Sequence, residues 1–177
     1  MFTGYHGSAG TAASVLAHTS IGIIQDVRLN GVSMGEYGIN AAVAGHFGVP
    51  VALITSDNTV VAQAHGLLGR DVVAWKSSGP WAPTPAVHLH PEKAREAIKA
   101  GAIEAVLRAP RLRPYRVPLP LRFEVDIVSP DLADLAGLLP GVRRVGPPSV
   151  AYEGPDVLDA FKAWRAMLNV MMSRAAV

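Results

Sequence analysis

The 177-residue sequence contains no cysteine, and this absence removes several classes of protein at once. There can be no disulfide framework, no cysteine-ligated zinc, no iron–sulfur cluster and no thiol nucleophile. Any metal site in this chain must therefore be built from histidine and carboxylate side chains.

An excess of one charge is also missing, because 16 Lys and Arg stand against 14 Asp and Glu and leave a formal net charge of +2. So small a surplus makes no electrostatic footprint for a polyanion, and the sequence predicts no nucleic-acid partner. Hydrophobic residues make up 50% of the chain and charged residues 17%, which is typical of a globular protein and not of a disordered segment.

Uncharged stretches occur, but none has the features of a membrane span or an export signal. Residues 1–25 lack the positive start of a signal peptide. Residues 37–56 are interrupted by Asn40, His46 and Pro50, which favours a helix followed by a buried strand. We therefore expect no membrane partner and, by default, a cytoplasmic location.

The periodicity of apolar residues predicts an α/β protein. Asn30-Gly31 indicates a hairpin, because both central residues of a type I′ turn need positive φ. The near-continuous apolar run 49–54 is typical of a strand covered on both faces. In chain order, the elements predicted for the first half are a hairpin over 25–34, a helix over 35–48, a strand over 49–54, a helix over 59–68 and a strand over 71–75.

A loop rich in Ser, Gly and Pro over residues 77–85 suggests a domain edge. We expect residues 1–78 to form a layered, mostly parallel sheet with flanking helices, and residues 79–177 a smaller α+β region. The second half is predicted to hold a helix over 91–107 with Ile103, Val106 and Leu107 on its apolar side, a proline-rich linker over 109–120, a strand over 121–128, a short helix over 131–139, a strand pair around 142–152 and a helix over 155–174.

Four residues are candidates for chemistry, and each has an ordinary structural explanation when taken alone. His6 lies in a glycine-flanked loop, and His18 would be satisfied by a backbone carbonyl. Glu36 opens a helix, where the helix dipole favours a carboxylate. Asn40 lies one turn beyond Glu36, where it would either orient a substrate or pack against a neighbouring element.

Taken together, three motifs in fixed order resemble a known family. Gly-Tyr-His-Gly, Ala-His-Thr-Ser and Gly-Glu-Tyr-Gly-Ile-Asn fall within residues 2–78 and resemble the D-aminopeptidases, zinc metallopeptidases of the type encoded in bacterial dipeptide-transport operons. The resemblance implies that His6 and Glu36 bind zinc and that His18 is the catalytic residue, acting either on a proton or as nucleophile. It also implies release of amino-terminal D-residues from short peptides by a ring-shaped homo-oligomer, a decamer.

The family builds a two-zinc site, and its other ligands, an Asp-x-Glu pair and a further His, lie upstream of Gly-Tyr-His. No such segment precedes His6 here, so we expect this chain to be a carboxyl-terminal portion with an incomplete zinc site. We then expect weak zinc binding and an unpaired sheet edge near residues 1–3. We also expect either self-association or a complementing amino-terminal segment. The alternative is a non-catalytic α/β binding or interaction domain that retains the scaffold.

Overall fold

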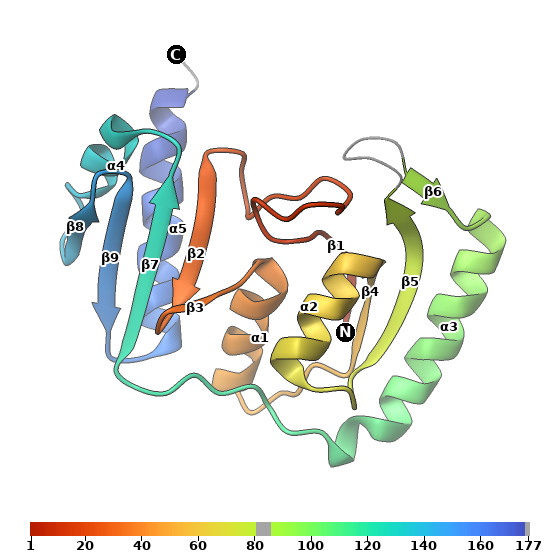
Figure 1. Ribbon diagram of the computed structural model, residues 1–177. Coiled ribbons are helices and arrows are strands. Elements are labelled where there is room, and N and C mark those ends of the chain that lie inside the picture. The colour runs from red at the N-terminus through yellow and green to blue at the C-terminus, as the bar shows by residue number, and fades with distance from the viewer. Residues whose placement is uncertain (81–85, 176–177) are drawn as a thin grey trace.

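The computed structural model describes residues 1–80 and 86–175 (Figure 1). Its first sheet contains the strand that leads directly into His6. This sheet has four strands in the order β1-β4-β5-β6, of which the first three run parallel and the last antiparallel. Its strands and the helices beside them are β1 (Phe2–Tyr5), β4 (Leu53–Asp57), β5 (Val73–Pro80), β6 (Ala86–His88), α1 (Glu36–His46), α2 (Asn58–Leu68) and α3 (Pro91–Arg108).

The second sheet is wholly antiparallel, with five strands in the order β3-β2-β7-β9-β8. A 3₁₀ turn (Ala109–Arg111) and the proline-rich linker lead from α3 into it. Its elements are β2 (Ile24–Leu29), β3 (Val32–Ser33), β7 (Leu121–Ile127), α4 (Pro130–Ala136), β8 (Val142–Gly146), β9 (Ser149–Gly154) and α5 (Val157–Ala175). The predicted α/β class is confirmed, with a parallel sheet, a separate antiparallel sheet and flanking helices.

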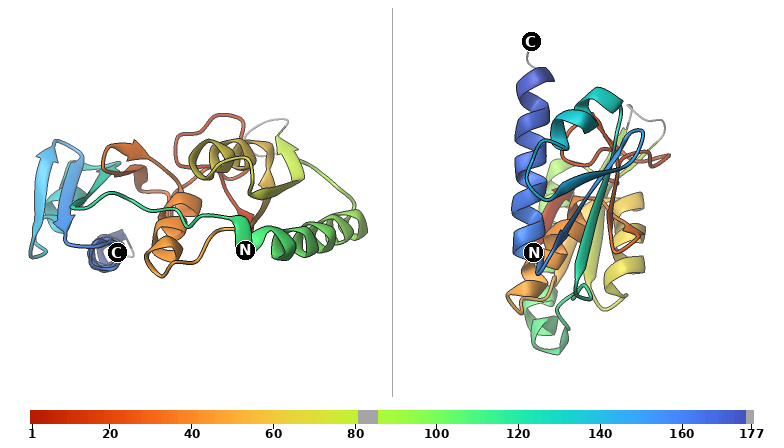
Figure 2. Two further views of the ribbon diagram at one scale, coloured as in Figure 1. Left: turned by 90° about the horizontal axis from the view of Figure 1, so that it is seen from below. Right: turned by 90° about the vertical axis from the view of Figure 1, so that its left-hand side faces the viewer.

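The helices cover the first sheet on both faces, as Figure 2 shows from below. Neighbouring residues of a strand point to opposite faces. Ile54 of β4 packs with α2, whereas Leu53 packs with Ala105 of α3. All five residues of β4 are therefore buried, as expected for an inner strand.

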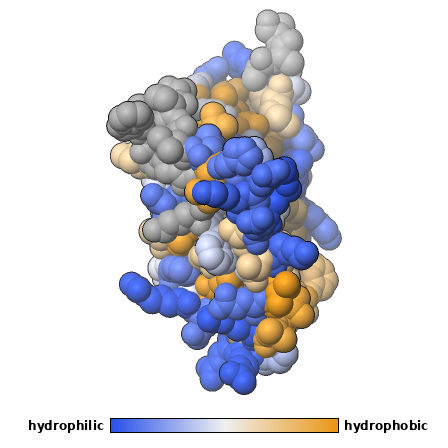
Figure 3. Space-filling view, turned by 90° about the vertical axis from the view of Figure 1, so that its right-hand side faces the viewer, coloured by the Kyte–Doolittle hydropathy of each residue, from blue (hydrophilic) through white to orange (hydrophobic). Residues whose placement is uncertain are grey.

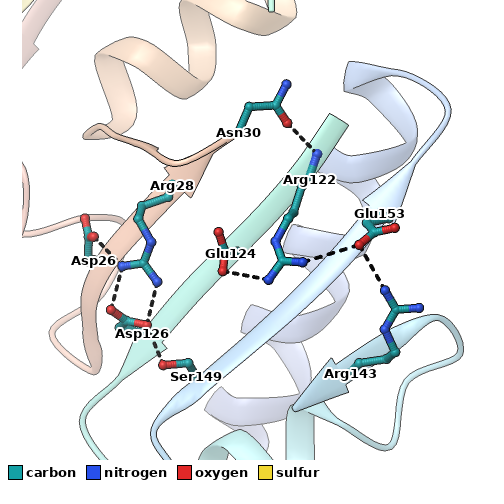
Figure 4. A network of polar contacts seen from close by, with 9 residues as sticks. All are labelled: Asp26, Arg28, Asn30, Arg122, Glu124, Asp126, Arg143, Ser149 and Glu153. Atoms are coloured by element: carbon teal, nitrogen blue, oxygen red, sulfur yellow. Dashed lines mark hydrogen bonds and ion pairs between the residues drawn. The ribbon is translucent and has the colours of Figure 1, made fainter. Parts of the chain in front are cut away.

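The main apolar core lies between the second sheet and α4, α5 and α1. Alternate residues of β7 are buried, which places Phe123 against Trp164 of α5 with their ring centroids 5.5 Å apart. On the opposite face of the sheet, Arg28 donates to both carboxylate oxygens of Asp126 at 2.6 and 2.9 Å (Figure 4). No helix in the described ranges 1–80 and 86–175 is long and apolar enough to cross a membrane.

Several local predictions are confirmed and three need correction. The loop expected over 77–85 is wrong in its first part, because β5 continues to Pro80, and its remainder lies outside the described residues. Asn30 and Gly31 have φ of 50° and 81°, as the predicted hairpin requires. The strand expected over 49–54 is instead Leu53–Asp57, because the polar residues after Ile54 stay hydrogen-bonded in the sheet. The helix over 91–107 exists, but its predicted apolar side is wrong: Ile103, Val106 and Leu107 are exposed, and Gly101 and Ala105 face the sheet.

The division at residue 78 stays a prediction, and strand pairing shows which elements cross it. The β2 hairpin comes from the first segment but pairs with β7 of the second sheet. Conversely, β6 pairs with β5 in the first sheet. Within the described residues, β1 pairs only with β4, so it stands at the sheet edge where the sequence predicts an open strand.

Candidate active site

The structure brings the three predicted residues His6, His18 and Glu36 together. His6 directly follows β1, and its ring centroid lies 4.8 Å from that of His18. His18 Nε2 lies 3.7 Å from Oε2 of Glu36, the first residue of α1. With Asn40 these side chains line one cavity of about 260 Å³. The cavity lies at the carboxyl end of β1, the edge at which α/β proteins bind ligands.

Backbone contacts fix the orientation of the His18 imidazole. Its Nδ1 lies 2.6 Å from the carbonyl oxygen of Leu16, and the His18 N–H donates to Gly7 O at 3.1 Å. A carbonyl oxygen only accepts, so the proton belongs on Nδ1. Nε2 is then the atom that faces Glu36, with a lone pair available for proton transfer in the neutral ring.

Strained backbone flanks His18 on both sides. Leu16 has φ of 51° and Ser20 has φ of 65°, the left-handed region that residues other than glycine seldom adopt. Such backbone conformations persist only where the surrounding contacts hold them in place, and they cluster at functional sites. In this loop the contacts are polar: the Thr19 hydroxyl accepts from Ala9 N–H at 3.0 Å.

Asp57 anchors this loop to the first sheet. One carboxylate oxygen accepts from the N–H groups of Thr59 and Val60 at the start of α2. The other accepts from the Ser14 hydroxyl at 2.7 Å and from Val15 N–H at 2.8 Å. Burial of Asp57 opposes its ionisation, but these hydrogen bonds hold the pKa of the carboxyl below its usual value. With both oxygens engaged, Asp57 positions the loop and is not arranged as a metal ligand.

Tyr5 belongs to the cavity although sequence reasoning gave it no role. Asn40 Nδ2 donates to the Tyr5 hydroxyl at 2.8 Å, so Asn40 both lines the cavity and joins α1 to β1. Burial raises the pKa of Tyr5, the Asn40 hydrogen bond lowers it, and the nearby charge of Glu36 raises it, with a net increase. The Tyr5 hydroxyl therefore stays protonated at neutral pH. Its place directly before His6 in Gly-Tyr-His-Gly was the signal available in the sequence.

The donor types at this site suit zinc, but the number of ligands is small. Imidazole and carboxylate are ordinary zinc ligands, and a zinc site usually takes three or four from the protein. Across residues 1–80 and 86–175, no group of three or more His, Asp or Glu is arranged to hold a metal ion. His6 and Glu36 would thus supply part of a ligand set.

Comparison with known proteins places this geometry in context. A family profile described as D-aminopeptidase matches residues 1–166. A D-aminopeptidase of Bacillus subtilis (strain 168) is 26% identical over 173 residues, which cover 97% of this chain and 62% of the relative. The chain thus spans less than two thirds of that relative's length.

A solved structure has the same fold. The Zn-dependent D-aminopeptidase DppA from Bacillus subtilis, described as a self-compartmentalizing protease, superposes with a TM-score of 0.90 at 25% sequence identity. The match covers 96% of this chain and 61% of that one.

Proposed function

Because this chain belongs to the D-aminopeptidase family, we propose that it carries the catalytic histidine of a zinc-dependent aminopeptidase that releases amino-terminal D-residues from short peptides. The observation that supports the proposal most is the meeting of His6 and His18, from the two ends of the loop after β1, with Glu36 of α1 in one cavity. A cytoplasmic location is proposed with it.

In this proposal His6 and Glu36 are the zinc ligands of this chain. When bound, zinc would polarise the peptide carbonyl and lower the pKa of a water molecule. Since zinc needs at least three protein ligands, we propose that the remaining ones come from a complementing amino-terminal segment. The chain alone is then expected to bind zinc weakly.

His18 is proposed as the catalytic residue and not as a ligand. Its Nδ1–H is engaged by Leu16 O, which leaves Nε2 to take or deliver a proton at the scissile bond. Direct attack by Nε2 on the carbonyl carbon is the other role open to it. Asn40, fixed by Tyr5, is proposed to orient the peptide beside it.

Self-association into a ring, a decamer with active sites facing an internal channel, is proposed for the assembled enzyme. The solved relative is described as self-compartmentalizing. On one face of α3, apolar side chains are open to solvent, among them Ile103, Val106 and Leu107. Figure 3 shows apolar surface on this side of the molecule. A second copy of the chain is proposed to cover this face. Ile103→Glu should then lower the sedimentation coefficient of the assembly, and an unchanged coefficient would place the contact elsewhere.

The test combines zinc affinity with hydrolysis of D-alanine amide. For the purified chain alone we expect weak zinc binding without turnover, and with the complementing segment we expect chelator-sensitive turnover that zinc restores. His6→Ala should abolish zinc binding. His18→Ala should keep zinc affinity and lose about 10²–10⁴-fold in turnover wherever turnover is measurable. His46→Ala, at the far end of α1, is the matched control.

Two outcomes would contradict the proposal. Equal loss of zinc in His18→Ala and His6→Ala would make His18 a ligand. Absence of both zinc binding and hydrolysis in the chain, with or without an added amino-terminal segment, would favour a non-catalytic binding domain.

A further inference from the structure

A second cavity adjoins the candidate active site across α1. It measures about 190 Å³, and Glu36 and Asn40 line it as they line the first. The two residues are four apart on a helix, so their side chains lie on the same face one turn from each other. They form a shared rim, and a ligand held at His6 and Glu36 can extend over it into the second cavity.

The far side of this second cavity is formed by α5. Phe161 supplies an apolar side chain and Arg165 supplies a guanidinium group. Trp164 and Ile39 of α1 also line the cavity, but they are only 1% and 3% exposed and offer a ligand almost no surface. The cavity thus combines one accessible apolar side chain with one cation.

Arg165 is an exposed residue without an ion-pair partner in the described part of the chain, unlike Arg28, Arg122 and Arg143 in the second sheet. Among the described residues, Glu36 is the only carboxylate that lines the cavity, and it forms no ion pair with Arg165. A planar guanidinium with free N–H groups beside the Phe161 ring is suited to a carboxylate, which it can bind through two hydrogen bonds.

We infer that Arg165 binds the carboxyl-terminal carboxylate of the substrate peptide, while Phe161 contacts the side chain of its last residue. This inference rests on the proposed function, because it takes the amino end of the peptide to lie at His6 and Glu36. It assigns the substrate class as short peptides with an unblocked carboxyl terminus. Longer peptides would place an uncharged backbone amide beside Arg165 and lose the ion pair.

The experiment measures binding and needs no turnover. The full chain, labelled with ¹⁵N and kept in chelator so that peptide stays intact, is titrated with D-alanyl-D-alanine and with its carboxyl-terminal amide, and NMR shifts give both dissociation constants. We expect the wild type to bind the acid about ten-fold more tightly than the amide, as for a lost hydrogen bond to a charged group.

Arg165→Gln should bind the acid about ten-fold more weakly than wild type does and should no longer distinguish acid from amide. Lys162→Gln, an exposed cation on the same helix outside this cavity, is the matched control and should keep the wild-type preference. If Arg165→Gln keeps the preference, or the wild type shows none or binds neither peptide, the inference is wrong. D-alanine amide has no carboxylate for Arg165 to bind. Its zinc-dependent hydrolysis therefore tests the proposed function separately from this inference.

Discussion

The two sheets are held in different ways, and the candidate site lies at the start of α1, the helix that contributes residues to the apolar clusters of both. The second sheet is closed by a large apolar core with Trp164 at its centre. The first sheet has smaller apolar clusters, and its helix α3 leaves Ile103, Val106 and Leu107 exposed. The loop that carries His18 is held to the first sheet by hydrogen bonds to Asp57.

This difference indicates that the two parts of the fold have different roles. The second sheet and α5 form a rigid support, against which α1 packs with Ile39 and Ala42. The side chains of the candidate site come from the end of β1, a strained loop and the start of α1. Substitutions in the support should therefore act on global stability, and those around Asp57 should act on the loop and respond to pH.

The largest effect on stability is expected from Trp164→Ala. Removing a fully buried aromatic side chain leaves a cavity, and such changes cost about 3–5 kcal/mol in the free energy of unfolding. Val49→Ala, at a side chain that is 53% exposed beside the first sheet and outside the exposed face of α3, should stay within about 0.5 kcal/mol of wild type. Urea denaturation measures both. Similar losses of unfolding free energy in the two variants would contradict the difference between the two regions.

The next effect concerns the linker that crosses α1. A Cβ atom at Gly45 would lie 1.7 Å from the carbonyl oxygen of Tyr115, a backbone atom that has no rotamer by which to move away. Gly45→Ala should therefore destabilise the chain by about 1–3 kcal/mol or more, as overpacking does. Thermal unfolding followed by circular dichroism gives the shift. An unchanged melting temperature would show that the linker does not rest on α1.

Asp57→Asn should lower stability by about 1–3 kcal/mol at neutral pH and reduce its pH dependence. The folded-state pKa of Asp57 is depressed, so its contribution is present above the unfolded pKa of about 3.9 and is lost as pH falls through the folded pKa. Urea midpoints between pH 6 and pH 3 should fall more steeply in wild type than in Asp57→Asn, with Ser14→Ala in between. Parallel slopes in all three would contradict this account of the loop.

The smallest effect has the opposite sign. Gly66 lies inside α2, and a Cβ atom there would meet nothing within 4 Å. Gly66→Ala should stabilise the chain by about 0.5–1 kcal/mol, because alanine loses less backbone entropy in a helix. A destabilised variant in urea denaturation would show that this surface of α2 is covered in solution.

Local signals predicted much of the fold, whereas the packing of α3 was beyond them. The turn at Asn30-Gly31 depends on its own two residues and was predicted correctly. Which side of α3 is buried depends on the sheet that it packs against. A Cβ atom at Gly101 would lie 2.4 Å from Trp75 Cδ1, so the close approach of α3 to the sheet requires small residues there. Apolar periodicity alone pointed to the larger side chains, which lie outside.

For the site, residue order predicted which side chains meet but not how they are held. His6, His18 and Glu36 were identified from motifs, and the structure brings them together. The hydrogen bond between Asn40 and Tyr5 and the anchoring by Asp57 join segments 35 to 43 residues apart in sequence, and spacing carries no signal for such contacts. Arg165 is even more distant in sequence, and only the packing of α5 against α1 brings it to the second cavity.

The position of bound zinc tests the central claim most directly. Crystals of the chain grown with millimolar zinc, measured at the zinc absorption edge, would locate the ion by its anomalous scattering. We expect a zinc ion about 2.0–2.2 Å from a His6 nitrogen and a Glu36 oxygen, with His18 beside it but outside ligand distance. A zinc ion coordinated by His18 in place of Glu36, or no zinc in this cavity, would contradict it.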